Sequence, residues 1–161
     1  MDDDILFDQI LPEDHSILSD IMIRAFDEDT SLHTDADRGG PNGYDDGTLL
    51  ELLIAKIGYK NFKIIYRGEI IGAYTFCIVQ DNLYSLEMMF IDPILRGEHL
   101  GTRVWKEIEE QYTNVEKWIT ETPNYSIRNN LFYTMKCGFR VIEERVHNNG
   151  AKSILYEKVL Q

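Results

Sequence analysis

Apolar residues in the first 58 positions recur at the spacing of helices. After Pro12, apolar side chains three or four positions apart predict an amphipathic helix that includes Ile17, Leu18, Ile21, Met22 and Phe26. A second apolar series runs through 49–57 and stops at Gly58, a residue type common after helix ends. Between them, residues 27–44 are acidic, contain glycines and Pro41, and show no period, so we expect a long loop.

From residue 61 the pattern changes to that of strands and short turns. Segments 62–66, 70–80 and 83–91 predict an antiparallel meander, preceded by a weak strand at 4–9. The apolar run 88–91 is typical of a strand covered on both faces. A helix at about 101–112, a strand at 115–120, a helix at 126–136 and two strands at about 138–142 and 153–160 follow. These elements predict one α/β (α+β) domain over residues 1–161, with a mixed, largely antiparallel sheet flanked by helices.

The negative charge of the chain is confined to its first 47 residues. Acidic residues number 28 and basic residues 16, a net charge of −12. Residues 1–47 hold 14 acids and two bases, Arg24 and Arg38, which already gives −12. Nucleic acid is therefore not an expected partner, because phosphate binding needs a basic face. The acidic segment favours a cationic partner; a solvated surface that aids solubility is the alternative.

Other compositional features point to a cytoplasmic protein without membrane contact or bound metal. The first residues, Met-Asp-Asp-Asp, are acidic, whereas a signal peptide begins with basic residues. The longest apolar run, 70–79, is shorter than the ~20 residues of a membrane helix. The two cysteines and four scattered histidines show no zinc-binding spacing.

The segment 92–102 joins a predicted strand to a predicted helix. Backbone N–H groups at a helix start lack partners, and the helix dipole adds positive charge, so such a place binds phosphate. Gly97 and Gly101 allow the backbone to approach a ligand. The glycine spacing matches neither a P-loop nor a dinucleotide-binding loop. On spacing alone, a structural turn is the alternative.

Two motifs together resemble the GNAT N-acetyltransferase superfamily. Arg96-Gly97-x-x-Leu100-Gly101-Thr102, after Pro93, is similar to the family's acyl-CoA pyrophosphate loop, and Leu131-Phe132-Tyr133-x-x-x-Cys137-Gly138-Phe139 is similar to its second signature. The order of predicted elements also agrees. Where the family usually has glycine the chain has His99, a residue type that tolerates left-handed backbone better than most. Ser126 stands in place of a usual asparagine, with Asn129 and Asn130 one turn later.

The resemblance implies acetyl-CoA as co-substrate and suggests a homodimer. Its pyrophosphate would bind to backbone amides of Arg96, Gly97, Glu98, His99, Leu100, Gly101 and Thr102, with Asn129 as a further contact. The pantetheine arm would pair with the main chain of Met89, Phe90 and Ile91, where the sheet splays between the strands at 83–91 and 115–120. A strand end that leads into a helix is also where α/β folds place anionic ligands.

Acyl transfer from a thioester to an amine requires a base, an oxyanion donor and a proton for the leaving thiolate. Glu87, set among apolar neighbours, is the candidate base, and its place nine residues before Arg96 resembles the polyamine acetyltransferase branch. Strand alternation would instead turn it to solvent or into an ion pair. Tyr133 is the candidate acid by the family's pattern; an aromatic residue packed in the core is the alternative.

The acidic segment also indicates the acceptor. In the family's layout the first two helices and their connection cover the acceptor side of the cleft, so Asp27, Asp29, Asp35 and Asp37 would attract a cationic small-molecule amine. Two other functions stay open: an acyl-CoA-binding regulatory module without catalysis, and acetylation of a protein N-terminus or lysine. Glu87 and Tyr133 both reaching the cleft would favour an enzyme.

Overall fold

The computed structural model describes residues 3–95 and 97–160, and their strands form one sheet of seven. The strands are β1 (Ile5–Gln9), β2 (Tyr59–Tyr66), β3 (Glu69–Gln80), β4 (Leu83–Ile91), β5 (Lys117–Pro123), β6 (Arg140–Val146) and β7 (Lys152–Val159). Their spatial order is β1-β2-β3-β4-β5-β7-β6, and the β4–β5 pair alone is parallel. The predicted mixed, largely antiparallel sheet is confirmed.

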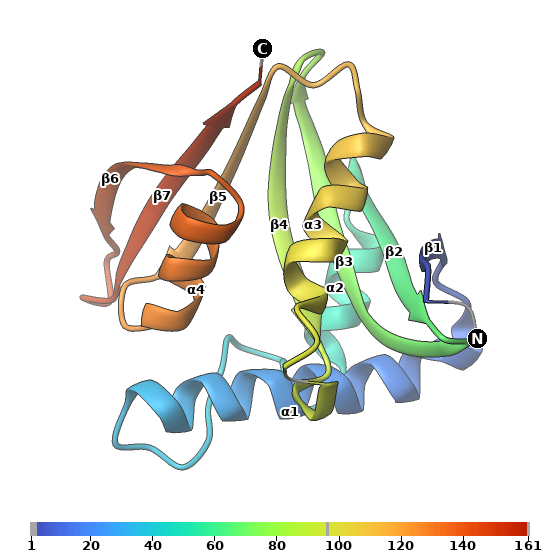
Figure 1. Cartoon of the computed structure of the whole chain (residues 1–161). Coiled ribbons are helices and arrows are strands. Elements are labelled where there is room, and N and C mark those ends of the chain that lie inside the picture. Colours follow the sequence, from blue (N-terminus) through green and yellow to red (C-terminus); the bar gives the residue numbers. More distant parts are fainter. Residues whose placement is uncertain (1–2, 96, 161) are drawn as a thin grey trace.

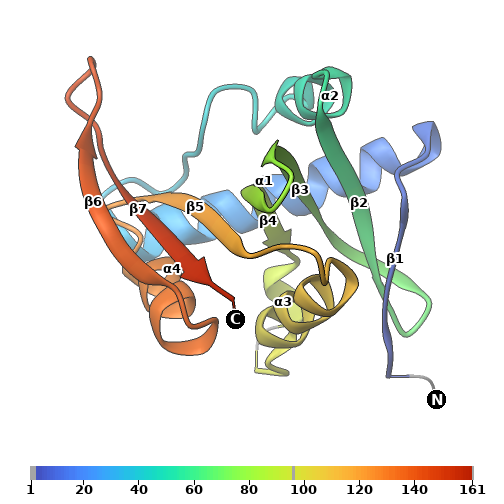
Figure 2. The same ribbon diagram turned by 90° about the horizontal axis from the view of Figure 1, so that it is seen from above.

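Helices cover both faces of this sheet (Figure 2). They are α1 (His15–His33), α2 (Thr48–Ala55), α3 (Leu100–Gln111) and α4 (Ile127–Leu131), and α4 continues as a wider π-helical turn at Phe132–Lys136. In Figure 2, α1 and α2 lie on one side of the sheet, and α3 and α4 on the other. Across the described part of the chain, no helix combines the length and apolarity needed to span a lipid bilayer.

Two hydrophobic cores fix these layers. Under α3 and α4, Trp105 and Ile108 pack on the sheet, and the rings of Trp105 and Trp118 lie 5.2 Å apart at a steep angle. On the opposite face Leu18 and Met22 of α1 pack against Phe90 of β4. The central strands are therefore covered on both sides, as the apolar run in 88–91 predicts.

The strands β4 and β5 pair over only four positions, from Leu83–Lys117 to Leu86–Thr120. At the last pair, Thr120 Oγ1 donates a hydrogen bond to the Leu86 carbonyl at 2.9 Å. Beyond it the strands diverge like the arms of a V (Figure 1). Among the described residues, no strand pairs with the 87–91 segment of β4 on this side. The predicted splay is confirmed, and it leaves this edge of β4 open.

One predicted boundary is wrong: α1 continues to His33, so Asp27 and Asp29 lie in a helix and not in a loop. The last two turns lack an apolar period and are held by polar contacts with the start of α4. The buried Asp29 carboxylate accepts a hydrogen bond from Ser126 Oγ at 2.8 Å, and Glu28 pairs with Arg128 at 2.9 Å. Hydrophobic spacing cannot register such contacts, which join residues about a hundred positions apart.

Candidate active site

A pocket of about 680 Å³ lies at the end of β4 that does not pair with β5. Its walls are the end of β4, the 92–102 segment with the first turn of α3, and α4, and residues of α1 complete it. Predicted cofactor-binding residues that line it are Met89, Ile91, Gly97, His99, Leu100, Gly101, Thr102 and Asn129. The structure therefore brings most of the predicted set together around one cavity.

Two of the predicted cofactor residues do not line this pocket. The Phe90 side chain is buried in the core under α1 and α2, so only its main chain belongs to the open edge of β4. Glu98 is exposed and forms an ion pair with Arg67 at 3.8 Å. Arg96 lies outside the described residues.

The backbone before α3 turns through two left-handed residues. Gly97 has φ 94°, and His99, directly before the helix, has φ 55° and ψ 30°. Histidine thus adopts the conformation that the family's glycine would take, as expected. A Cβ on Gly101 would lie 3.1 Å from Phe132 Cε1, so glycine permits the close approach of α3 to the segment after α4. The free N–H groups at the start of α3 therefore border the pocket, where they favour an anion.

Glu87 is the extra residue of a β-bulge in β4. Thr75 pairs with Met88 and Phe76 with Leu86, which leaves Glu87 unpaired in the ladder. Its exposed carboxylate accepts hydrogen bonds from Tyr59 Oη at 2.8 Å and Ser85 Oγ at 3.2 Å. Because Tyr59 belongs to β2, the carboxylate is directed over β3 and away from β5. Its neighbours are polar, contrary to the expectation from its apolar sequence context.

Tyr133 is buried in the core under α3 and α4, with its ring 5.1 Å from Phe132 and 5.5 Å from Phe139. Burial raises the pKa of its phenol, and the nearby Cys137 thiol raises this pKa further, while a hydrogen bond with Thr120 lowers it. Thr120 is the last β5 residue to pair with β4, so the phenol lies near the point of the V. Neither Tyr133 nor Glu87 lines the 680 Å³ pocket. Their catalytic roles stay predictions.

Comparison with known protein families assigns the chain that forms this pocket to a family. Residues 49–160 match the family model described as the acetyltransferase (GNAT) domain. The chain belongs to the GNAT acetyltransferase family. A curated relative of this GNAT chain is the uncharacterized protein YrkN of Bacillus subtilis (strain 168), 33% identical over 98 residues. That match covers 55% of the chain and 53% of YrkN, so the chain spans about half the length of this relative.

Solved structures of other acetyltransferases share the fold. An acetyltransferase from Thermus thermophilus has a TM-score of 0.71 and 16% identity, with 97% of each chain covered. The PaiA N-acetyltransferase from Thermoplasma acidophilum, solved in complex with coenzyme A, has a TM-score of 0.71 and 13% identity, with 98% and 99% covered. A GNAT family acetyltransferase from Elizabethkingia anophelis with acetyl-CoA bound has a TM-score of 0.62 and 16% identity, with 99% and 100% covered.

The acids predicted to bind substrate differ in their availability in this GNAT chain. Asp27 accepts hydrogen bonds from Tyr44 Oη at 2.6 Å and from the Gly39 N–H at 3.2 Å, and so folds the 34–47 segment back onto α1. Asp29 is held by Ser126, as described above. Asp35 and Asp37 are exposed, and within the described residues neither has a hydrogen-bond or ion-pair partner. These two remain the acids best placed to meet a ligand.

Several pocket residues of the GNAT chain were not predicted: Ala25, Glu28, Arg128, Leu131, Phe132, Met135 and Lys136. Arg128 and Lys136 bring positive charge to a pocket expected to hold phosphates. The sequence feature that could have identified Arg128 and Lys136 is their position on the predicted 126–136 helix, which carries the second signature. Arg128 is also an ion-pair partner of Glu28 at 2.9 Å, so it links α4 to α1 across the pocket.

Proposed function

We propose that this chain is an N-acetyltransferase that transfers the acetyl group of acetyl-CoA to a primary amine of a cationic small molecule. The observation that carries the proposal is one pocket bordered by both the open edge of β4 and the first turn of α3. An extended arm with amide groups can add to a free strand edge, and a pyrophosphate suits a helix start. Membership of the GNAT acetyltransferase family supports this assignment of acetyl-CoA.

The transfer is a direct attack of the amine on the thioester. A primary alkylamine has a pKa of ~10, so it must lose a proton before its nitrogen can attack at neutral pH. The C–N bond forms, the C–S bond breaks, and the electron pair passes to sulfur. Tyr133, near the point of the V, would protonate the thiolate. Glu87 would serve as base only after its carboxylate turned from Tyr59 toward the gap.

The acceptor is proposed to be a cation because exposed acids lie on the side of α1 and α2. Asp35 and Asp37 belong to the segment that connects these helices, within the 47 residues that carry the whole net charge of −12. A one-signed patch concentrates ligands of opposite charge. Spermidine is a suitable probe of this class.

A regulatory module that binds acyl-CoA without catalysis is the second candidate. It is favoured by the position of Tyr133 and Glu87, neither of which lines the pocket. Such a module would bind acetyl-CoA but would not turn it over.

Release of free thiol from acetyl-CoA distinguishes the two functions. We expect thiol release to require both the protein and an added amine, and to be faster with spermidine than with a neutral amine. N-acetylspermidine should be formed as the product. A lysine-containing peptide tests whether a protein can be the acceptor. Protein without amine is the control for hydrolysis. Binding of acetyl-CoA with no thiol release for any amine would favour the module.

A further inference from the structure

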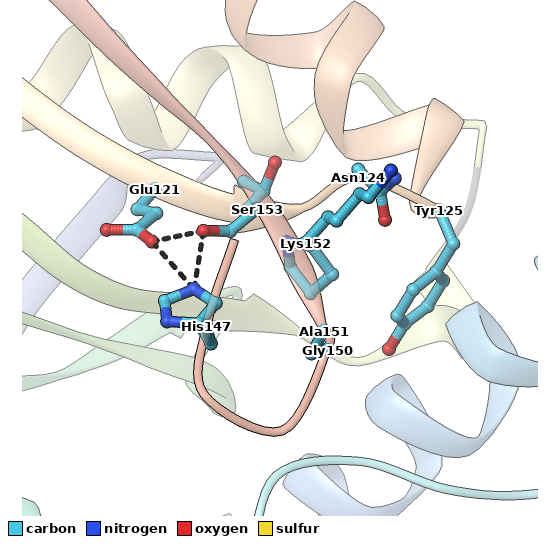
Figure 3. Close-up of a pocket in the computed structure, with 10 residues that line it drawn as sticks. Glu121, Asn124, Tyr125, His147, Gly150, Ala151, Lys152 and Ser153 are labelled. Carbon is cyan, nitrogen blue, oxygen red and sulfur yellow. Dashed lines mark hydrogen bonds and ion pairs between the residues drawn. The ribbon is translucent and has the colours of Figure 1, made fainter. Parts of the chain in front are cut away.

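A second pocket, of about 650 Å³, lies beneath the β6–β7 hairpin. The end of β5 and the loop after it form one wall, with Glu121 and Tyr125, and the hairpin forms the other, with His147 and Ser153 (Figure 3). In Figure 2 the tip of this hairpin points to the side of the sheet that carries α2 and the 34–47 segment, away from α3. This is the side from which we expect the acceptor to approach.

Sheet register places the pocket beside the gap. Glu121 directly follows Thr120, the last β5 residue that pairs with β4, and a strand advances only ~3.3 Å per residue. Glu87 follows Leu86 in the same way on β4, but its carboxylate is directed away toward β2. Glu121 therefore adjoins the point of the V from the β5 side, and His147 lies beside the Glu121 carboxylate, further toward the hairpin tip.

A chain of hydrogen bonds determines which nitrogen of His147 carries the proton. Ser153 Oγ donates its single proton to the Glu121 carboxylate, because an ionised carboxylate can only accept. The same oxygen lies 2.8 Å from His147 Nε2, so Nε2–H must be the donor in that contact. Neutral His147 thus keeps an unprotonated Nδ1. The side chain is 48% exposed, and solutes can reach it.

The charged groups around His147 suit an imidazole that takes up a proton. His147 Nε2 lies 3.5 Å from Glu121 Oε2, and Arg145 donates to the other carboxylate oxygen at 3.1 Å. Arg145 also pairs with Glu143 at 3.1 Å. Lys152 lines the pocket, but its side chain extends toward Asn124 and away from the imidazole (Figure 3). Glu121 is therefore the counter-ion that would face an imidazolium.

We propose that His147 Nδ1 accepts the proton of the acceptor amine, with Glu121 and Ser153 as positioning residues. The proposal rests on the proposed function. His147 takes one proton from R–NH₃⁺, the freed nitrogen pair forms the C–N bond, and the C–S bond breaks with its electron pair on sulfur. Tyr133 gives its phenol proton to the thiolate and regains a proton from the attacking nitrogen, and His147 returns its proton to solvent. The products are the N-acetylamine, coenzyme A thiol and one proton.

The test compares H147Q with H15Q, a matched substitution at the start of α1, using acetyl-CoA and spermidine from pH 6 to pH 10. We expect kcat/KM of H147Q to fall ~10²-fold at pH 7, the usual scale for one general base. The loss should shrink toward pH 10, where about half of the amine is already neutral. H15Q should keep the wild-type profile. E121Q should lower kcat/KM less and E121D should restore most of it, because only the aspartate keeps a counter-ion.

The rise in melting temperature that acetyl-CoA causes must match wild type in H147Q, which shows that fold and cofactor binding persist. An equal loss at every pH, or a low-pH loss in E87Q and not in H147Q, would overturn the role of His147 while the acetyltransferase function stood. A wild-type protein inactive with every amine would instead overturn the proposed function, and the role of His147 with it.

Discussion

The two halves of the sheet are built differently. Strands β1–β4 lie between α1 and α2 on one face and α3 on the other, and six consecutive residues of β3 are buried. In the β5–β7 half α4 packs on one face, and all seven residues of β6 are exposed. The first half therefore derives its shape from core packing. The second leaves its edge strand β6 open to solvent, and its strand β5 borders the gap.

The largest expected effect is on the free energy of unfolding, and it should differ between two carboxylates, one from each half of the sheet. Asp14 and Lys63 form an ion pair at 2.7 Å with side chains only 8% and 10% exposed. Asp14→Asn would leave a buried ammonium without its counter-ion and lower the free energy of unfolding by ~3–5 kcal/mol. Glu157 pairs with Lys117 and Arg140, whose side chains are 42% and 75% exposed, so Glu157→Gln should cost ~1 kcal/mol or less. Similar losses in urea unfolding would refute the comparison.

The same carboxyl group predicts a pH dependence. Burial by itself would raise the pKa of Asp14, but hydrogen bonds from Lys63 and the Leu11 N–H outweigh it and lower the pKa. Its contribution to stability is therefore complete above the ordinary aspartate pKa of ~3.9 and is lost as pH falls through the lowered value. Urea unfolding between pH 3 and pH 6 should show this loss in wild type, and Asp14→Asn should lack that component.

The next largest effect is on turnover, and it concerns Tyr133, which lies near the point where the two halves of the sheet part. Tyr133→Phe removes a proton donor and keeps the ring packed against Phe139, so kcat should fall ~10²-fold while acetyl-CoA affinity is unchanged. Because burial raises the pKa of Tyr133, the phenol keeps its proton from pH 6 to pH 9, and the loss should be the same across that range. Tyr84→Phe, in the same core, is the control. Normal turnover in Tyr133→Phe would make Tyr133 a packing residue only.

The smallest effect concerns the acidic segment. Neutralising Asp35 and Asp37 together should raise KM for spermidine about two- to five-fold, since exposed charges each contribute ~0.2–1 kcal/mol. Added salt should raise the wild-type KM in the same direction, because charges are screened over ~8 Å at physiological ionic strength. The pair Glu110→Gln and Glu116→Gln removes two exposed acids elsewhere as the control. An unchanged preference for spermidine over a neutral amine would show that the segment does not select the acceptor.

The fold was predictable where apolar side chains determine it. In the apolar run of β4, Phe90 is buried and its neighbours are half-buried against the two cores. The helical spacing of Val104, Trp105 and Ile108 in α3 corresponds to buried positions. The last turns of α1 were not predictable, because Asp29 is ordered by Ser126, 97 positions away in the sequence. The spacing of apolar residues carries no record of such a polar contact.

The site divides in the same way. The 92–102 segment identified one wall of the first pocket, since its glycines and its place before a helix are local features. The direction of Glu87 was not predictable, because a bulge breaks the alternation of β4 and the hydrogen-bond partner comes from β2. The contacts among Glu121, His147 and Ser153 depend on the β5–β7 register and on the closure of a hairpin.

The most direct test of the central claim, that the gap between β4 and β5 holds acetyl-CoA, is the change in melting temperature on adding this ligand to wild type and to Gly101→Val. At one hundred times the dissociation constant, the ligand should stabilise wild type by ~2.7 kcal/mol, a rise of about 5–10 °C. In Gly101→Val the added side chain would press on Phe132, 3.1 Å from the new Cβ, and narrow the pocket that both residues line. We predict that the rise disappears in Gly101→Val and is reduced in Gly101→Ala. A full rise in Gly101→Val would contradict the account, because the 92–102 segment would then be a turn and not a binding loop.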